Sequence, residues 1–248
     1  MRARAHLLLG GELLLVGRLD HLADPVHLLV VPDVHVLDTD TSSVDVVFVI
    51  DVSGSFRGEI ERTIYGIAPL LEDELTQDFR FGLVVIGHKR EVGVNYINGT
   101  MRLVTDMVPR ELFLDHLYEA KRIAEGSTSG QEPSYDAITW VVRNDFNLSF
   151  REDANKVIVV MTDEGGQSFD DPTTDETETG LLVENSPFIV HVYSERQYMW
   201  TFDAITRVQS SFHALEDHPD TEEVFQSLRR IFLNICTGEE TPQEGSPP

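Results

Sequence analysis

Residues 44–55 read Val-Asp-Val-Val-Phe-Val-Ile-Asp-Val-Ser-Gly-Ser, and they are the most informative part of the sequence about the fold. The run from Val44 to Ile50 is almost wholly apolar and rich in valine, which is typical of a strand buried on both faces of a parallel sheet. Three oxygen-bearing side chains, Asp51, Ser53 and Ser55, follow it at alternate positions. Because open α/β sheets bind ligands at the carboxyl ends of their strands, the stretch predicts a central strand with a binding site at its end.

Strand-like and helix-like segments alternate through the rest of the chain. Short apolar runs predict five further strands, at residues 81–86, 101–104, 156–161, 188–193 and 212–215. Apolar residues at helical spacing predict helices near residues 60–75, 109–123, 134–146, 198–209 and 221–236. This alternation predicts an α/β fold, with a doubly wound, mostly parallel six-stranded sheet flanked by helices and one short antiparallel edge strand.

The regular pattern has clear limits along the chain. It predicts one domain over residues 44–236. Residues 1–43 form an N-terminal extension of unknown role, whose basic start and short apolar stretch have the outline of a signal peptide that Glu12 interrupts. Residues 237–248 are rich in Glu, Pro and Gly without an apolar pattern, and we expect them to be disordered.

Composition narrows the classes of partner and location. The chain carries 43 acidic and 19 basic side chains, for a formal net charge of −24. Such a surface repels a phosphate backbone, so we expect no nucleic-acid partner, and no apolar run reaches the roughly 18 residues needed to span a membrane. The single cysteine, Cys236, excludes an internal disulfide and a cysteine-based zinc site. Because the composition is acid-rich and lysine-poor, as in proteins of salt-accumulating halophiles, and no convincing signal segment is present, we favour a cytoplasmic location over export.

Two further segments carry candidate oxygen ligands at positions that we expect to lie near Asp51, Ser53 and Ser55. The strand at 156–161 leads directly to Asp163, and the glycine pair that follows favours a turn. A Gly- and Ser-rich loop over residues 125–136 carries Glu132 just before the next helix. Carboxylates and hydroxyls are hard ligands, which suit Mg²⁺ or Mn²⁺ and are poor for zinc. The sequence therefore predicts one divalent-metal site at the carboxyl edge of the sheet.

At residues 44–236 the sequence resembles the von Willebrand factor A family, also called the integrin I domain. The family's metal-ion-dependent adhesion site contains the motif Asp-x-Ser-x-Ser, a distant Thr or Glu, and a distant Asp. Asp51, Ser53 and Ser55 match the first part, and Asp163 matches the last. The resemblance implies a doubly wound α/β fold with this site at the strand ends.

The middle ligand of the resemblance has two candidates. The string from Glu132 to Ile138 is similar to the Glu-Gly-Gly-Phe-Asp-Ala-Ile of integrin β subunits, in which the Glu is the ligand. Thr128, in Gly-Ser-Thr, is the alternative, because many members carry a Thr in a Gly-Gly-Thr loop. We favour Glu132, which stands at the family's spacing before the helix, and retain Thr128.

The resemblance also implies a function. Two serine hydroxyls and one carboxylate would bind Mg²⁺ directly, Asp51 and Asp163 would act through waters, and a Glu or Asp of a partner protein would fill the open position. We therefore expect a non-enzymatic, metal-dependent protein-binding module. An accessory subunit of an ATPase-type complex, using the same site, is the alternative.

Other patterns in the sequence give weaker hypotheses. An apolar strand ending in Asp38 and Asp40 resembles the nucleophile loop of haloacid-dehalogenase-type phosphatases, a remote enzymatic alternative for which no other part is recognisable. The acidic run over residues 170–178 has no EF-hand spacing, so we expect a solvated loop there. The histidines show no ligand-like pairing, and we expect His191 to be packed within its strand.

Overall fold

The computed structural model describes residues 43–72, 78–87, 100–125, 132–169, 174–207, 210–215 and 221–237. The extension before Ser43, the Asp38 and Asp40 pair, Thr128 and the tail after Thr237 lie outside the described residues. Within the described segments, no helix combines the length and the apolar character that crossing a membrane requires.

The described residues form six strands and six helical segments. The strands are β1 (Ser43–Asp51), β2 (Asp78–Ile86), β3 (Met101–Pro109), β4 (Asn155–Met161), β5 (Phe188–Glu195) and β6 (Ser211–Leu215). The helices are α1 (Arg57–Glu72), α2 (Arg110–Glu125), α3 (Ser134–Arg143), α4 (Glu176–Glu184), the 3₁₀ helix η1 (Arg196–Phe202) and α5 (Thr221–Thr237).

The strands form one sheet in the order β3-β2-β1-β4-β5-β6. Five strands are parallel, and β3 pairs with β2 in the antiparallel sense, with register shifts around Leu83. The predicted α/β fold is therefore confirmed, including its single antiparallel edge strand. Because β1 lies between β2 and β4, the direction of winding reverses between β1 and β4. That reversal is where sheets of this class bind ligands.

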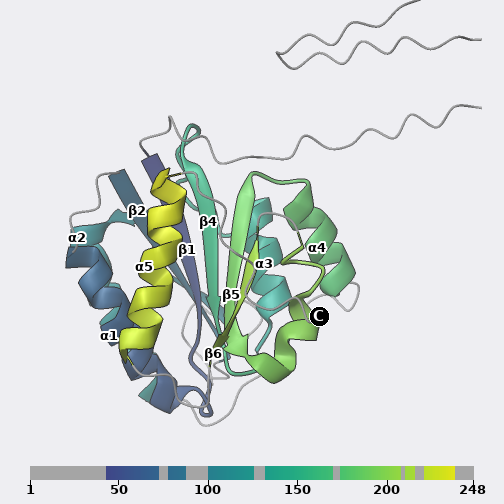
Figure 1. Ribbon diagram of the computed structural model, residues 1–248, viewed down its shortest axis with the longest axis horizontal. Helices are drawn as coiled ribbons and strands as arrows, with labels where there is room; N and C mark the ends of the chain where they lie inside the picture. The colour runs from purple at the N-terminus through teal and green to yellow at the C-terminus, as the bar shows by residue number, and fades with distance from the viewer. Residues whose placement is uncertain are drawn as a thin grey trace, which may run out of the picture. The chain divides into compact units, whose positions relative to one another are not determined.

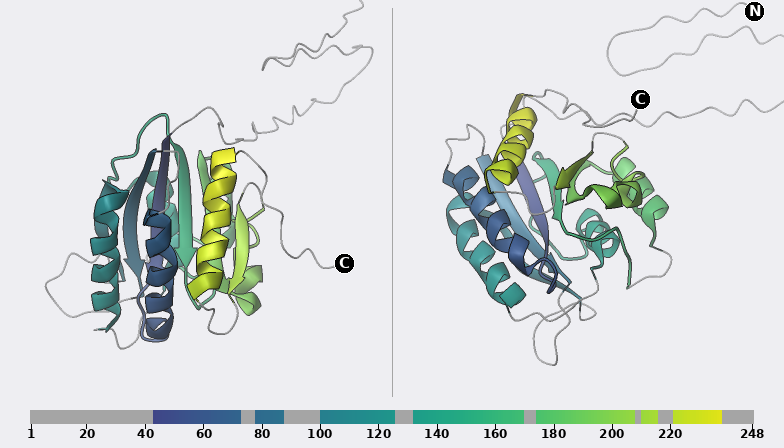
Figure 2. Two further views of the ribbon diagram at one scale, coloured as in Figure 1. Left: turned by 60° about the vertical axis from the view of Figure 1, so that its left-hand side comes forward. Right: turned by 60° about the horizontal axis from the view of Figure 1, so that its bottom comes forward.

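Helices cover both faces of the sheet. Residues of α1, α2 and α5 pack with Val46 and Phe48 of β1 in one core cluster, and residues of α3, α4 and η1 pack with Val47 and Val49 in the other. Figure 1 shows the two layers, and the first view of Figure 2 shows α1, α2 and α5 side by side in front of the sheet. All four of these β1 side chains are completely buried, as the valine-rich run predicts.

Several element boundaries differ from the expectations. The edge strand β3 extends to Pro109, which pairs with Arg80, and α2 begins after the proline instead of at it. An edge strand tolerates proline because its N–H side can face solvent. Helix α3 ends at Arg143 because Asn144 adopts a left-handed conformation with φ of 58°. The segment expected as a helix at 198–209 is the shorter 3₁₀ helix η1.

Residues 170–173 of the acidic run lie outside the described residues, but the run is a helix from Glu176 onward, so the expectation of a solvated loop was wrong for that part. Glu176 begins α4, and the side chain of Asp175 accepts a hydrogen bond from the N–H of Glu178 at 2.9 Å. An aspartate at this position satisfies one of the free N–H groups at a helix start. The acidic side chains of this segment thus lie at the start of a helix, where their negative charge interacts favourably with the positive end of the helix dipole.

Candidate metal centre

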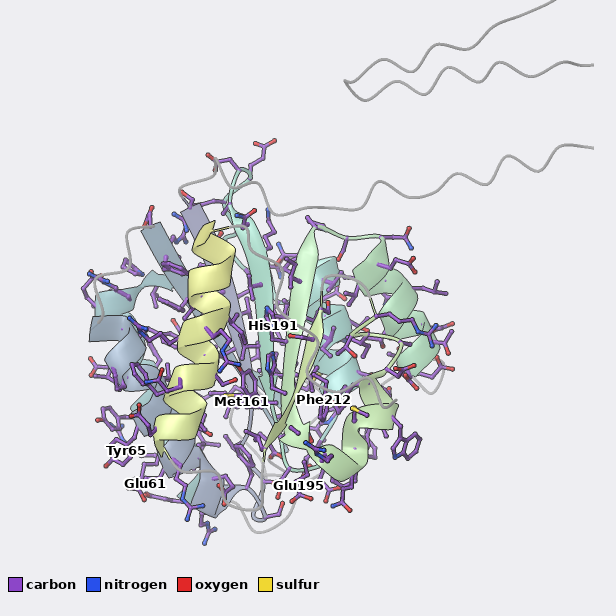
Figure 3. The ribbon with its side chains drawn as sticks, viewed as in Figure 1. Glu61, Tyr65, Met161, His191, Glu195 and Phe212 are labelled. Carbon is purple, nitrogen blue, oxygen red and sulfur yellow. The ribbon has the colours of Figure 1, made fainter. Side chains whose placement is uncertain are left out.

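Three carboxylates from distant parts of the chain meet at the carboxyl edge of the sheet. Asp51 ends β1, Asp163 follows β4, and Glu132 stands two residues before α3. Each offers one oxygen, and these oxygens all lie within 4.8 Å of one another. In the part of the chain that the structure describes, this is the one cluster of three side chains of ligand type. In Figure 3, His191 lies near the middle of β5 and Glu195 at its lower end, which marks the carboxyl edge of the sheet as the lower one.

Asp51 is held firmly at the end of β1. Its side chain is completely buried. The backbone N–H of Ser53 donates to Oδ1 at 2.7 Å, and the hydroxyl of Thr162 donates to Oδ2 at 3.0 Å. Both carboxylate oxygens therefore have partners within the protein, and the group is oriented by the strand next to it in the sheet.

The two serines connect Asp51's loop to Asp163. The hydroxyl oxygens of Ser53 and Ser55 lie 2.8 Å apart, and the Ser55 hydroxyl donates to Oδ1 of Asp163 at 3.5 Å. The N–H of Phe56 donates to the Ser53 hydroxyl at 3.4 Å, which closes the turn into α1. These hydrogen bonds link four of the expected residues into one group: Asp51, Ser53, Ser55 and Asp163.

Glu132 adds a further carboxylate to this group of oxygen atoms. Its side chain is only 5% exposed, and its Oε2 atom is buried without a hydrogen-bond partner. An unsatisfied buried carboxylate oxygen is costly in free energy. Of the two candidates for the middle position, the structure places Glu132 in the cluster, whereas Thr128 lies outside the described residues.

The electrostatics of the cluster favour a bound cation. Burial raises the pKa of Asp51 well above its usual value, and the charges of Glu132 and Asp163 raise it further, against the hydrogen bonds from Ser53. Burial is also the main cause that raises the pKa of Glu132 to about 7, with help from the charge of Asp163. A divalent ion among these groups would neutralise the carboxylates and give Oε2 of Glu132 a partner. The residues present therefore fit a metal ion.

Sequence reasoning missed two residues of this centre. Gly87 directly follows β2 with φ of +83°, and a Cβ there would lie 2.6 Å from Oδ1 of Asp51 and 3.1 Å from Cγ of Glu132. Only a glycine both adopts that conformation easily and leaves room for the two carboxylates. Thr162 provides the hydrogen bond to Asp51 described above. The available signals were a glycine immediately after a buried strand and a hydroxyl beside Asp163.

The strand order, the helices on both faces and the carboxylate cluster at the winding reversal are consistent with a Rossmann-like fold of the von Willebrand factor A type. Among solved structures, the chain is similar to proximal thread matrix protein 1 from the mussel byssus. One structure of it, crystal form 2, has 13% identity and a TM-score of 0.57 over 78% of this chain and 48% of that one. Another has 11% identity and a TM-score of 0.53 over 81% and 48%.

The chain spans about half the length of the mussel structures, and at such identities the likeness concerns the fold alone. No family model matches the sequence, and no curated protein matches it. The function must therefore be argued from the site itself.

Proposed function

We propose that the chain is a divalent-metal-dependent protein-binding module. One Mg²⁺, or Mn²⁺, would bind among Asp51, Ser53, Ser55, Glu132 and Asp163, and a Glu or Asp of a partner protein would complete its coordination. The observation that carries the proposal is the buried Oε2 of Glu132, which has no hydrogen-bond partner and lies beside two further carboxylates. The proposal assigns no catalytic residue.

The hydrogen bonds suggest which groups would touch the ion. Both oxygens of Asp51 already accept hydrogen bonds from Ser53 and Thr162, so Asp51 would act through coordinated water. Glu132 has a free oxygen and would bind directly, together with the hydroxyls of Ser53 and Ser55. Hard oxygen donors of this kind match the preference of Mg²⁺ and Mn²⁺.

The metal would also explain how an acidic protein recognises an acidic residue. The formal net charge of −24 repels carboxylates in general. A bound dication supplies local positive charge at one point of this surface. Partner binding would then require both the metal and a carboxylate placed to reach it.

The proposal is tested by calorimetric titration of Mg²⁺ and Mn²⁺ into EDTA-stripped protein in high KCl. We expect saturable binding to one site, which a Ser53→Ala, Ser55→Ala double variant loses. The matched control is Ser149→Ala, Ser186→Ala, which removes two serine hydroxyls that hydrogen-bond Asp106 and Val183, away from the cluster. No binding by the folded wild-type protein would refute the metal site.

A second experiment addresses the partner. Proteins retained by the immobilised chain in Mg²⁺ are compared with those retained in EDTA. The proposal expects metal-dependent retention that changing the partner's acidic residue to its amide abolishes. A partner that is retained equally in EDTA would contradict the mechanism, even if the metal binds.

A further inference from the structure

The loop after β4, residues 163–169, is fastened to the start of α3. The N–H of Tyr135 donates to the carbonyl of Gln167 at 3.0 Å, and the N–H of Gln167 donates to the hydroxyl of Ser134 at 3.3 Å. This loop carries Asp163, and Ser134 stands two residues after Glu132. Two of the three clustered carboxylates therefore belong to segments that are bound directly to each other.

Asp136 makes the strongest of these connections. It lies in the first turn of α3 and is 1% exposed. Its Oδ1 accepts a hydrogen bond from the hydroxyl of Ser168 at 2.5 Å, and its Oδ2 accepts one from the N–H of Phe169 at 2.6 Å. Hydrogen bonds to an ionised carboxylate are short and about twice as strong as neutral ones. A single buried side chain thus holds the far end of the loop.

Loop 163–169 and the start of α3 also form hydrogen bonds to η1. The hydroxyl of Tyr135 donates to the carbonyl of Thr201, and the N–H of Gly166 donates to the Thr201 hydroxyl at 2.8 Å. A Cβ on Gly166 would lie 2.1 Å from the ring of Tyr135, so the loop packs against that ring without space for a side chain. The loop is consequently held on two sides, by α3 and by η1.

We infer that Asp136 is a positioning residue of the metal centre, which fixes Asp163 relative to Glu132 by holding loop 163–169 against α3. The inference rests on the proposed metal site. Mg²⁺ requires nearly ideal octahedral geometry, and Glu132 and Asp163 come from different segments that nothing in the local sequence brings together. Hydrogen bonds from outer groups to ligand-bearing segments are what set such geometry.

The test compares Asp136→Asn with a matched variant elsewhere. Asp106 on β3 also accepts one backbone N–H and one hydroxyl from a distant segment, the N–H of Ser149 at 2.7 Å and the Ser149 hydroxyl at 2.5 Å, and it accepts the N–H of Met107 at 2.6 Å as well. It lies beside the middle of β2, between the pairs that Leu83 and Phe81 make with β3, and away from the strand end at Ile86 that adjoins the centre. Asp106→Asn therefore weakens a similar link between two segments, at a partly buried carboxylate, without touching the metal centre.

For each variant we would measure the calorimetric Kd for Mg²⁺ and the melting temperature of the metal-free protein. Loss of an outer hydrogen-bonding group typically weakens metal binding about 10- to 100-fold, so we expect at least a tenfold weaker Kd for Asp136→Asn. A purely structural role would lower the melting temperature but leave the Kd of the folded protein unchanged. Ser168→Ala, which removes one of the two donors, is expected to weaken binding by less than Asp136→Asn.

The outcomes separate the two proposals. Weaker binding in Asp136→Asn, with an unchanged Kd in Asp106→Asn, supports the positioning role. Equal Kd values in wild type and Asp136→Asn overturn that role and leave the proposed function standing. Equal weakening in both variants also overturns it, because the effect would then be a general one. Absence of Mg²⁺ binding in wild type overturns the proposed function and this inference together.

Discussion

Gly87 lies beside the carboxylate cluster, at a position where any side chain would displace Asp51. Its backbone has φ of +83°, a region that costs other residues roughly 1–2 kcal/mol. Asp51, Ser53 and Ser55 could be predicted because a short motif after one strand contains all three. Gly87 and Thr162 were missed, because the sequence signals at these residues acquire their meaning only once β2 and β4 are known to flank β1.

Changing Gly87→Ala should weaken Mg²⁺ binding. The new methyl group would lie 2.6 Å from Oδ1 of Asp51 and must push that carboxylate away. We expect at least a tenfold weaker Kd by calorimetry, similar to the loss of an outer ligand-orienting group. The control is Gly58→Ala in α1, where a Cβ meets nothing within 4 Å. An unchanged Kd in Gly87→Ala would show that the cluster is not the metal site.

A buried histidine, His191, and a partly buried one, His213, predict a pH dependence of stability. His191, packed in β5 as expected, and His213 in β6 both hydrogen-bond the Ser211 hydroxyl, at 2.7 Å each. Burial lowers the pKa of His191 to about 3 and that of His213 to about 4. The unfolded chain binds protons near pH 6.5, so the neutral pair contributes stability above that pH, and this contribution is lost as the pH falls toward 4.

The measurement is denaturant unfolding at pH 7 and pH 5 in wild type and in His191→Gln, His213→Gln. Each histidine should cost wild type on the order of 2 kcal/mol over this interval, from about 1.4 kcal/mol per pH unit below 6.5. The double variant should show a correspondingly smaller decrease. Equal pH dependence in wild type and the double variant would contradict the assignment.

Among the elements, strands were easier to predict than helices. The four inner strands, β2, β1, β4 and β5, are largely apolar runs, and burial on both faces makes those runs visible in the sequence. Helix α4 was missed because its start is acidic and its apolar residues show little helical periodicity, so it follows mainly from the Asp175 cap and packing against α3. The role of Asp136 was also not predictable from its own segment, because its partners Ser168 and Phe169 belong to another loop.

The contact between α1 and α5 leaves no room at Gly66. A Cβ there would lie 2.7 Å from Cγ1 of Val224, so Gly66→Ala must separate the two helices. Overpacking of this kind costs about 1–3 kcal/mol, measurable as a decrease in the free energy of unfolding. Gly58→Ala in the same helix should leave that free energy unchanged or raise it by up to about 1 kcal/mol. A neutral result at Gly66 would mean that α5 is loosely held.

For the molecule as a whole, charge repulsion opposes folding. A formal net charge of −24 concentrates like charges on the compact state, and salt screens them within about 10 Å at 0.1 M and about 3 Å at 1 M. We expect the melting temperature of EDTA-treated protein to rise by several degrees between 0.1 and 1 M KCl. A melting temperature independent of KCl would contradict a destabilising role of the net charge.

The two edge strands of the sheet affect how readily copies of the molecule aggregate. One edge is β3, whose pairing with β2 is irregular around Leu83, and the other is β6, which has only five residues. A regular, long edge strand can recruit a strand of another chain and begin aggregation. Because neither of these edges, as far as the described residues show, is both long and regular, the sheet offers no ready template for fibre growth at high protein concentration.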